Sequence, residues 1–406
     1  MKPCCLIRLL LVIMVFTHLI FKAPADTHIV PIEIILIDAN ATLFGTFQSY
    51  NQKVVSNQNG IFMTHVRSRN DDYTAQHWRL SRSTDGGLSF YTLYEATHAT
   101  NPPVLETDSQ DNIYLMRADF TNNNAYLYRF LAEDNYVNPL ISTVSGVGAD
   151  KYSMVLDEQA GLLYFFSKYD RFSVLSLDGT LQRSVRLHRS GQYAGLVYPL
   201  LSLAPDGILH LAWTTQKHDF YLYWDIHHML TPDRGLSWMN LNNTPLSLGF
   251  RGIVADNSGP TLRITLDDEF ETHTWLSSFI VKQRKIHFAY RAEGLRQHHV
   301  RYDIVTGIRD VDHQELRGET INLNNLDGFF ASDAARPSSP LYYVSLDVDR
   351  LACLVSLDNG LTWHDHARAN TPRAGTYAIG GCRQLTADGY IIGSFTATGY
   401  NPERVY

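Results

Sequence analysis

The chain has 406 residues, of which 12% are Phe, Trp or Tyr, and its formal net charge at pH 7 is −7. This charge gives no basic footprint for nucleic acid, so the composition argues against nucleic acid as a ligand. The aromatic content and the lack of a long apolar stripe with helical period favour an all-β fold of many short strands.

Residues 1–25 have the pattern of a secretion signal. A basic start precedes an apolar run from Leu9 to Phe21, and Ala23-Pro24-Ala25 offers a cleavage site of small residues. The run of about 13 residues is too short to span a bilayer. We therefore expect residues 26–406 to form the mature protein, which would be secreted or periplasmic and not attached to a membrane.

Two cysteines, Cys353 and Cys382, remain after removal of the signal. An oxidising compartment permits a disulfide between them. Two separate buried thiols on strands are the alternative, and the sequence leaves both open.

A turn followed by a β-rich run recurs along the mature chain. Each copy is typical of the hairpin between the first and second strands of an antiparallel sheet. The copies lie at Asn59–Met63, Asp111–Leu115, Ala160–Tyr164, Asp206–His210, Arg284–Phe288 and Asp388–Ile392.

Three further turns share the pattern Ser/Thr-x-Asp-x-Gly-x-Ser/Thr-aromatic, at Ser83–Phe90, Thr231–Trp238 and Ser356–Trp363. In such a turn the Asp accepts hydrogen bonds from local backbone N–H groups, the Gly takes a positive φ and the aromatic side chain packs inward. The pattern resembles the Asp-box, or BNR repeat, of sialidase-like β-propellers. The spacing of the copies suits a repeat of roughly 50 residues with insertions.

This resemblance implies a single β-propeller domain. The turns place blades near residues 50–95, 100–135, 150–187, 196–245, 256–308 and 320–368, and half a blade at 376–406. The strand-like segment Ile29–Ile37 can supply the missing strands and close the ring by joining the N- and C-terminal strands. We predict seven blades, with six as the alternative.

The turns named above belong to one face of a propeller, so we expect a binding site in the loops of the opposite face. Those loops combine cationic, His and aromatic residues, which suit an acidic sugar because Arg and Lys pair with a carboxylate and rings stack on the sugar. The predicted substrate-binding residues are Arg67, His98, Arg117, Lys151, Trp213, Lys217, His218 and Arg291.

The segment from Tyr198-Pro199 through Asp206–Thr214 to Asp225–His227 is similar to the BNR-repeat family that contains polysaccharide lyases acting on ulvan and on rhamnose–glucuronate linkages. By this resemblance Tyr198 matches the catalytic Tyr of the family, and His273 matches one of its histidines. The family also implies an Arg after the Trp, where this chain has Thr214.

A second departure lies at Leu115–Asp119, where the family carries a His-rich stretch. β-Elimination removes a proton next to a uronate carboxylate, so a cation or strong donor must stabilise the developing enolate. Lys217, Arg117 or Arg291 would have to take that role here.

The leading hypothesis is therefore an enzyme that cleaves an acidic polysaccharide or oligosaccharide by β-elimination, without a cofactor. The alternative is a non-catalytic propeller that binds glycan or protein, which the missing Arg favours. A sialidase-like exo-glycosidase, using Arg67, Arg251 and Arg291 with Asp71 or Asp72, is the third hypothesis, and paired carboxylates within Asp267–Glu271 would serve another glycosidase.

Metal binding is not expected. The adjacent pairs His227-His228 and His298-His299 lie in strand-like runs, where neighbouring side chains face opposite sides of the sheet.

Overall fold

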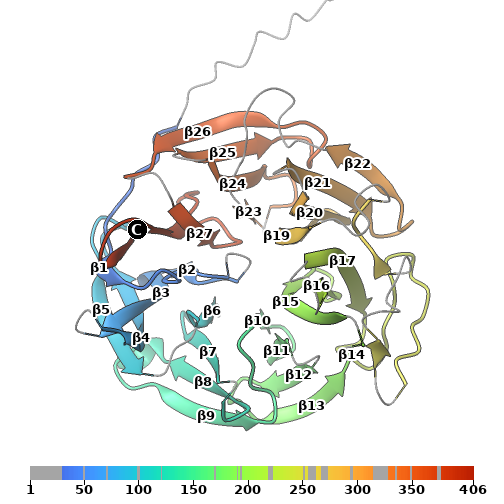
Figure 1. The fold of residues 1–406 in the computed structure, drawn as a ribbon, viewed down its shortest axis with the longest axis horizontal. Coiled ribbons are helices and arrows are strands. Elements are labelled where there is room, and N and C mark those ends of the chain that lie inside the picture. The colour runs from blue at the N-terminus through green and yellow to red at the C-terminus, as the bar shows by residue number, and fades with distance from the viewer. Residues whose placement is uncertain are drawn as a thin grey trace, which may run out of the picture.

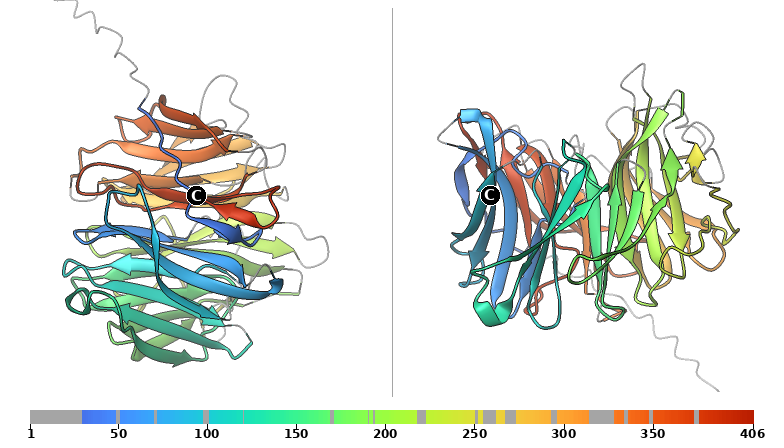
Figure 2. Two further views of the ribbon diagram at one scale, coloured as in Figure 1. Left: turned by 90° about the vertical axis from the view of Figure 1, so that its left-hand side faces the viewer. Right: turned by 90° about the horizontal axis from the view of Figure 1, so that it is seen from below.

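The computed structural model describes most of the mature chain. The described residues are 30–48, 51–69, 72–97, 101–119, 121–168, 171–189, 191–192, 194–217, 223–249, 252–254, 262–266, 273–292, 296–313, 328–333, 336–347, 350–372 and 376–406. They form an all-β structure in which twisted sheets stand radially around a common centre (Figure 1), and Figure 2 shows the same sheets from the side.

Four sheets have the same antiparallel order of four consecutive strands. Their strands are β6 (Val104–Thr107), β7 (Ile113–Asp119), β8 (Asn124–Phe130) and β9 (Leu140–Ser145); β10 (Tyr152–Asp157), β11 (Leu162–Ser167), β12 (Arg171–Ser176) and β13 (Leu181–Arg186); β19 (Trp275–Lys282), β20 (Lys285–Ala292), β21 (Arg296–Asp303) and β22 (Arg309–His313); and β23 (Gly328–Ser332), β24 (Leu341–Asp347), β25 (Arg350–Ser356) and β26 (His364–Asn370). Strand β9 lies beyond residue 135, so the second predicted blade ends too early.

Another sheet contains β15 (Ala194–Leu203), β16 (Leu209–Lys217) and β17 (Tyr223–Thr231), and Met239 forms an isolated bridge to Leu230 at its outer edge. A short parallel pair, β14 (His188–Arg189) and β18 (Ile253–Val254), lies beside it.

The two ends of the described chain share one sheet. Its order is β27 (Thr376–Gly381), β28 (Gly393–Ala397), β29 (Glu403–Val405), β1 (Asp38–Ala41), β3 (Gly60–Arg69), β4 (Asp72–Ser83) and β5 (Tyr91–Thr97), and β2 (Val54–Asn57) also pairs with β3. The N-terminal strand differs from the predicted segment, because residues 31–37 have no regular secondary structure and the strand begins at Asp38.

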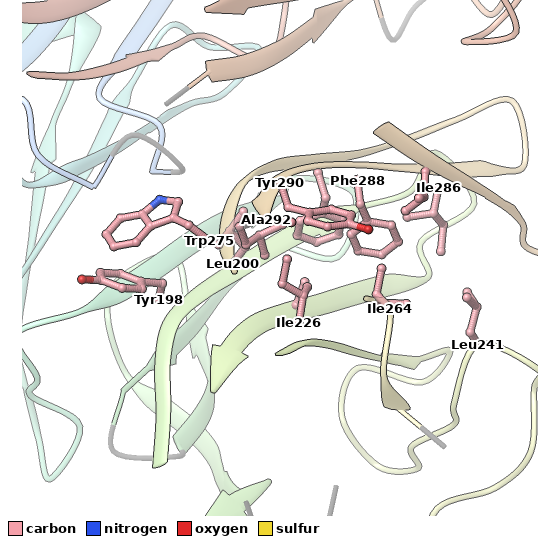
Figure 3. Packing of buried hydrophobic residues seen from close by; sticks show 14 of the residues in the cluster. Tyr198, Leu200, Ile226, Leu241, Ile264, Trp275, Ile286, Phe288, Tyr290 and Ala292 are labelled. Atoms are coloured by element: carbon pink, nitrogen blue, oxygen red, sulfur yellow. The ribbon is translucent and has the colours of Figure 1, made fainter. Parts of the chain in front are cut away.

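The core lies between neighbouring sheets. All eight residues of β19 are buried, and β15 and β20 are buried almost throughout, because both faces of each inner strand are covered. One apolar cluster joins β15, β17, β19 and β20 (Figure 3). The outer strands β5 and β9 are largely exposed, and the outer strand β26 is mostly half-buried. Cys353 and Cys382 are separate buried thiols.

The three Asp-containing turns have one hydrogen-bond geometry. Asp85, Asp233 and Asp358 each accept, at Oδ1, the backbone N–H of the Ser or Thr four residues later, at 2.9, 2.7 and 2.8 Å. The Gly in the fifth position has φ of 96°, 86° and 86°. Each turn is thus held by bonds within five residues, which is why a local sequence pattern specifies it.

A cluster of hydrogen-bonded side chains lies near the common centre of the sheets. Arg383, which follows β27, donates to the carbonyl of Leu201 at 3.0 Å and to Glu106 Oε1 at 3.1 Å. Gln52 donates to Glu106 Oε2 at 3.0 Å and accepts the backbone N–H of Arg383 at 3.1 Å. Residues from four different segments of the chain are therefore joined near the common centre of the sheets.

Two equivalent histidine pairs cross neighbouring strands. His210 on β16 and His228 on β17 lie 3.1 Å apart (Nδ1 to Nε2), and His287 on β20 and His299 on β21 repeat this distance. Trp363 of the third Asp-containing turn donates to His299 Nδ1 at 3.3 Å, so one pair also holds that turn in place.

These buried histidines predict a steep acid limit to stability. Burial lowers the pKa of His210, His227 and His287 to about 3 and that of His228 and His299 well below the ordinary value. The folded state keeps them neutral, whereas the unfolded chain protonates them below pH 6.5, so stability is lost as the pH falls. Each of these histidines lowers the free energy of unfolding by up to about 1.4 kcal/mol for every pH unit below 6.5. Burial raises the pKa of Glu106, which stabilises the folded state as the pH falls, but the five histidines together have the larger effect.

We expect the free energy of unfolding, measured by urea titration, to fall by several kcal/mol between pH 6.5 and pH 4.5. A profile that stays level over this range would contradict neutral burial of the histidines. The carboxylates with lowered pKa titrate below this window and serve as an internal control.

Candidate functional site

Tyr198 occupies an irregular point of β15. The pairing of β15 with β16 shifts register between Val197 and Leu200, and Tyr198 has a φ of 53°. A left-handed backbone is unusual for an aromatic residue and is found preferentially at functional sites, where surrounding contacts hold it. The bulge removes Tyr198 from the regular alternation of the strand and sets the direction of its side chain.

Aromatic rings surround Tyr198. Its ring centroid lies 4.3 Å from that of Trp275, 5.4 Å from Tyr223 and 6.3 Å from Phe47. Its hydroxyl is 2.9 Å from the hydroxyl of Tyr223, and only 4% of the residue is exposed. Figure 3 shows Tyr198 and Trp275 at one end of the cluster, with the Tyr198 hydroxyl directed away from the apolar side chains.

His273 packs against Tyr223. The backbone N–H of Tyr223 donates to His273 Nδ1 at 3.4 Å, and the two rings are 5.0 Å apart. Because Nδ1 accepts a hydrogen bond, the neutral imidazole carries its proton on Nε2. The structure therefore brings Tyr198 and His273, the two predicted catalytic residues, onto Tyr223.

Lys217 and Arg291 lie on elements next to this group. Lys217 ends β16, and its Nζ is 4.4 Å from the ring centroid of Trp224, which follows Tyr223. Arg291 pairs in the β19–β20 ladder with Trp275. Both residues are partly exposed.

The segment between β1 and β2 forms another wall. Its Phe47 ring lies between Tyr198 and Lys151, whose Nζ is 5.5 Å from the Phe47 centroid. Thr46 donates to the carbonyl of Ala378, and Gln48 donates to that of Asp150, both at 2.8 Å. The segment is thus tied to two sheets that are far apart in sequence.

Lys151 belongs to a small ion cluster beside Phe47. Asp150 Oδ2 lies 3.2 Å from Lys151 Nζ and 3.4 Å from Lys168 Nζ. Burial lowers the pKa of Lys151, and Asp150 opposes that effect. Sequence reasoning missed Tyr223, Trp275, Phe47 and Asp150 as neighbours of the predicted site, because nothing local marks them.

The structure corrects the prediction that Trp213 binds substrate. It is fully buried, with ring centroids 6.3 Å from Phe166, 5.7 Å from His188 and 5.8 Å from His227. It lies in the middle of β16, where neighbouring sheets cover both faces, so it packs in the core and does not face a substrate.

Arg117 is also largely buried. Its guanidinium lies 4.4 Å from the ring centroid of Tyr126, and 7% of the residue is exposed. His98, His218, Arg251, Asp71 and the segment 267–271 lie outside the described residues.

Arg67 belongs to a charge cluster at the junction of β1 with β3 and β4. Asp38 Oδ2 lies 2.9 Å from His65 Nε2, 3.2 Å from Arg67 Nε and 3.3 Å from Arg79 NH1. Although burial opposes it, the hydrogen bond and charge of His65 lead the effects that hold the pKa of Asp38 at about 2. Here Arg67 holds the N-terminal strand in place instead of joining the Tyr198 group.

The cluster predicts different consequences for its members. Asp38→Asn should lower the free energy of unfolding at pH 7 by about 2 kcal/mol, because the lowered pKa of Asp38 reports stabilisation of that size. This stabilisation is present above pH 3.8 and is lost as the pH falls towards 2, so the difference between the variant and the wild type should shrink in acid. Urea titrations of both proteins at pH 7 measure the difference, and titrations repeated down to the acid limit set by the buried histidines show whether it shrinks.

Arg67→Gln should lower the free energy of unfolding by less than Asp38→Asn does, because His65 and Arg79 still pair with Asp38. It should also leave saccharide affinity unchanged in isothermal titration. An equal loss of affinity and stability would show that Arg67 also serves the binding site.

A cavity of about 570 Å³ is lined by the turns after β10, β15 and β19 together with Glu106 and Arg383. Its Lys282 donates to the carbonyl of Pro337 and to Ser339 Oγ, both at 3.0 Å. The charged groups named for this cavity are therefore bonded within the protein.

In the part of the chain that the structure describes, no group of three or more His, Cys, Asp or Glu side chains is arranged to hold a metal ion. Nor does any helix within those residues have the length and apolar character needed to cross a membrane.

The structure is similar to those of polysaccharide lyases. An ulvan lyase of family PL25 bound to -[GlcA(1-4)Rha3S]- superposes with a TM-score of 0.67 at 10% identity, covering 91% of this chain and 94% of that one. The polysaccharide lyase Uly1 gives 0.59 at 11% identity, covering 93% and 98%. No protein-family model and no curated sequence match the chain. The likeness establishes a β-propeller-like fold of the kind these lyases have.

Proposed function

We propose that the protein is a carbohydrate-active enzyme that cleaves an acidic, uronate-bearing polysaccharide or oligosaccharide by β-elimination. The observation that carries this proposal is the Tyr198 group. The Tyr198 backbone is left-handed, its hydroxyl is 2.9 Å from the Tyr223 hydroxyl, and His273 packs against the Tyr223 ring. The fold that holds this group is similar to that of an ulvan lyase. The neighbouring ulvan lyase binds an acidic oligosaccharide, which supports the same substrate class here.

The chemistry needs one proton acceptor and one proton donor. The Tyr198 phenolate takes the proton from C5 of the uronate, the electron pair forms the C4=C5 double bond, and the C4–O bond breaks. The Tyr198 hydroxyl then gives its proton to the leaving oxygen, which restores the phenolate. The Nε2–H of His273 donates to the uronate carboxylate and stabilises the charge that develops on it.

Lys217 and Arg291 supply the positive charge that the family takes from an Arg after the Trp. Thr214 at that position is fully buried, and its Oγ1 accepts the N–H of Leu276 at 3.4 Å. The replacement therefore belongs to the core, and the cations of neighbouring elements take its place beside the carboxylate.

Two further parts of the proposal concern the whole molecule. Residues 1–25 direct export, and the mature chain acts outside the cytoplasm. Seven blades form the ring, and β1 completes the last of them by pairing with β29, as its register Asp38 to Val405 supports.

A binding protein without catalysis is the second candidate. The 4% exposure of Tyr198 and the inward position of Thr214 favour it, because both reduce the reactive groups presented to a ligand. A sialidase-like site receives less support, since Arg67, one of its three required arginines, is paired with Asp38 and Glu95.

The test is incubation with a panel of uronate-bearing polysaccharides, following the near-ultraviolet absorbance of unsaturated uronate. Tyr198→Phe should lower kcat roughly 10²- to 10⁴-fold, the range expected for loss of a general acid–base group, and leave saccharide affinity nearly unchanged. Tyr302→Phe is the matched control, because the Tyr302 hydroxyl bonds the Ile264 carbonyl at 3.3 Å and does not touch Tyr198.

Full activity in Tyr198→Phe would refute the role of Tyr198. Saccharide binding without any unsaturated product in the wild type would establish the binding protein instead, and a fluorogenic sialoside tests the third candidate.

A further inference from the structure

Tyr223 stands at the start of β17 and is 7% exposed. Each phenol hydroxyl has one proton to donate and lone pairs that accept. In the pair formed with Tyr198 at 2.9 Å, one hydroxyl therefore donates to the other. When Tyr198 is ionised, Tyr223 is the only one of the two that still has a proton to give.

Packing holds the Tyr223 ring in this position. Its centroid lies 4.8 Å from that of Trp275 at an interplanar angle of 83°, and 5.0 Å from that of His273. Its carbonyl accepts the N–H of Thr274 at 2.7 Å, so the backbone is fixed to the next segment as well. A ring held on these sides keeps its hydroxyl directed at Tyr198 without reorganisation, which is what a preorganised donor requires.

The surroundings make such a donor necessary. Tyr198 is enclosed by Trp275, Phe47 and Tyr223, and an isolated charge in an aromatic enclosure is strongly disfavoured. A hydrogen bond to an ionised acceptor is about twice as strong as one between neutral groups. The Tyr223 hydroxyl thus stabilises the phenolate form of Tyr198 more than it stabilises the phenol form.

We propose that Tyr223 is the positioning residue of this site: its hydroxyl donates to Tyr198 Oη and stabilises the Tyr198 phenolate. The part of this inference that concerns catalysis rests on the proposed function, whereas the pairing itself does not. Among the described residues, the segments packed around Tyr198 also carry His273, Lys151, Lys217 and Arg291. Strand β17 adds the buried Asp225, whose Oδ1 accepts from Thr265 Oγ1 at 2.6 Å. Further along the same strands lie His210, His227, His228, Lys282, Lys285 and His287.

The experiment measures Tyr198 directly in the full mature chain. Tyrosine labelled with ¹³C at Cζ reports ionisation by NMR, and the Tyr198 signal is assigned by its absence from Tyr198→Phe. In Tyr223→Phe the Tyr198 midpoint should move to higher pH by about one to two units, the range given by the loss of one hydrogen bond to a charged group. In the control Tyr302→Phe it should not move.

A Tyr198 midpoint that is the same in Tyr223→Phe and the wild type would overturn the inference. The wild type provides a second arm should the variant fold poorly. Because the two hydroxyls are hydrogen-bonded, loss of one proton from the pair changes the environment of both rings, so the Tyr198 and Tyr223 signals should respond together in one titration step. Independent responses would overturn the pairing.

Activity distinguishes the two proposals. If the protein is a lyase, the rising limb of its pH–rate profile should move in Tyr223→Phe with the NMR midpoint, and a purely structural role of Tyr223 would lower activity without moving that limb. If no polymer yields unsaturated uronate, the proposed function is wrong, while the NMR comparison still decides on the tyrosine pair.

Discussion

The constraint on which this structure depends is the bonding of buried carbonyl groups at its centre. The innermost strands are edge strands, so their inward backbone groups lack a partner strand and must be bonded by other means. Arg383 bonds Leu201 and Met154, Gln52 bonds Leu105, and Asn51 bonds Tyr152. At the centre, long polar side chains thus bond the backbone carbonyl groups that neighbouring strands bond elsewhere in the sheets. These bonds also fix the sheets relative to one another.

The same central hydrogen bonds hold one wall of the candidate site. The segment from Thr42 to Lys53 supplies several of these donors and also carries Phe47 to the Tyr198 ring. Lys53 is fully buried and bonds the carbonyls of Gln48 and Asn51, so the segment is held from within. The wall of the site is therefore part of the central bonding network, and the aromatic group around Tyr198 rests on a rigid base instead of a free loop.

Local interactions explain which parts could be predicted from the sequence. The Asp-containing turns and the first hairpins were predictable because their hydrogen bonds join residues within a few positions. The N-terminal strand was placed too early, and β9 was missed, because their partners impose no local pattern. Trp213 is of a residue type that often stacks on sugars, and only the packing of sheets on both faces of β16 shows that it belongs to the core.

The site itself depended on longer separations. Tyr198 and Tyr223 are 25 residues apart, and only the bulge at Val197–Leu200 directs one hydroxyl to the other. Phe47 reaches the same ring from the segment between β1 and β2, near the N-terminal end of the described chain. Sequence resemblance nominated Tyr198 and His273, but a pattern of residue types contains no information on backbone irregularity or on which rings meet.

The attachment of Thr46 to Thr396, 350 residues further along the chain, has a consequence for biosynthesis. Contacts of such separation form only after the loop between them has been ordered, and they are slow to form. During synthesis the segment bearing Phe47 emerges early and must wait for the last strands before it can dock. The bonds that fix this wall of the aromatic enclosure to Ala378 and Thr396 are therefore among the last to form.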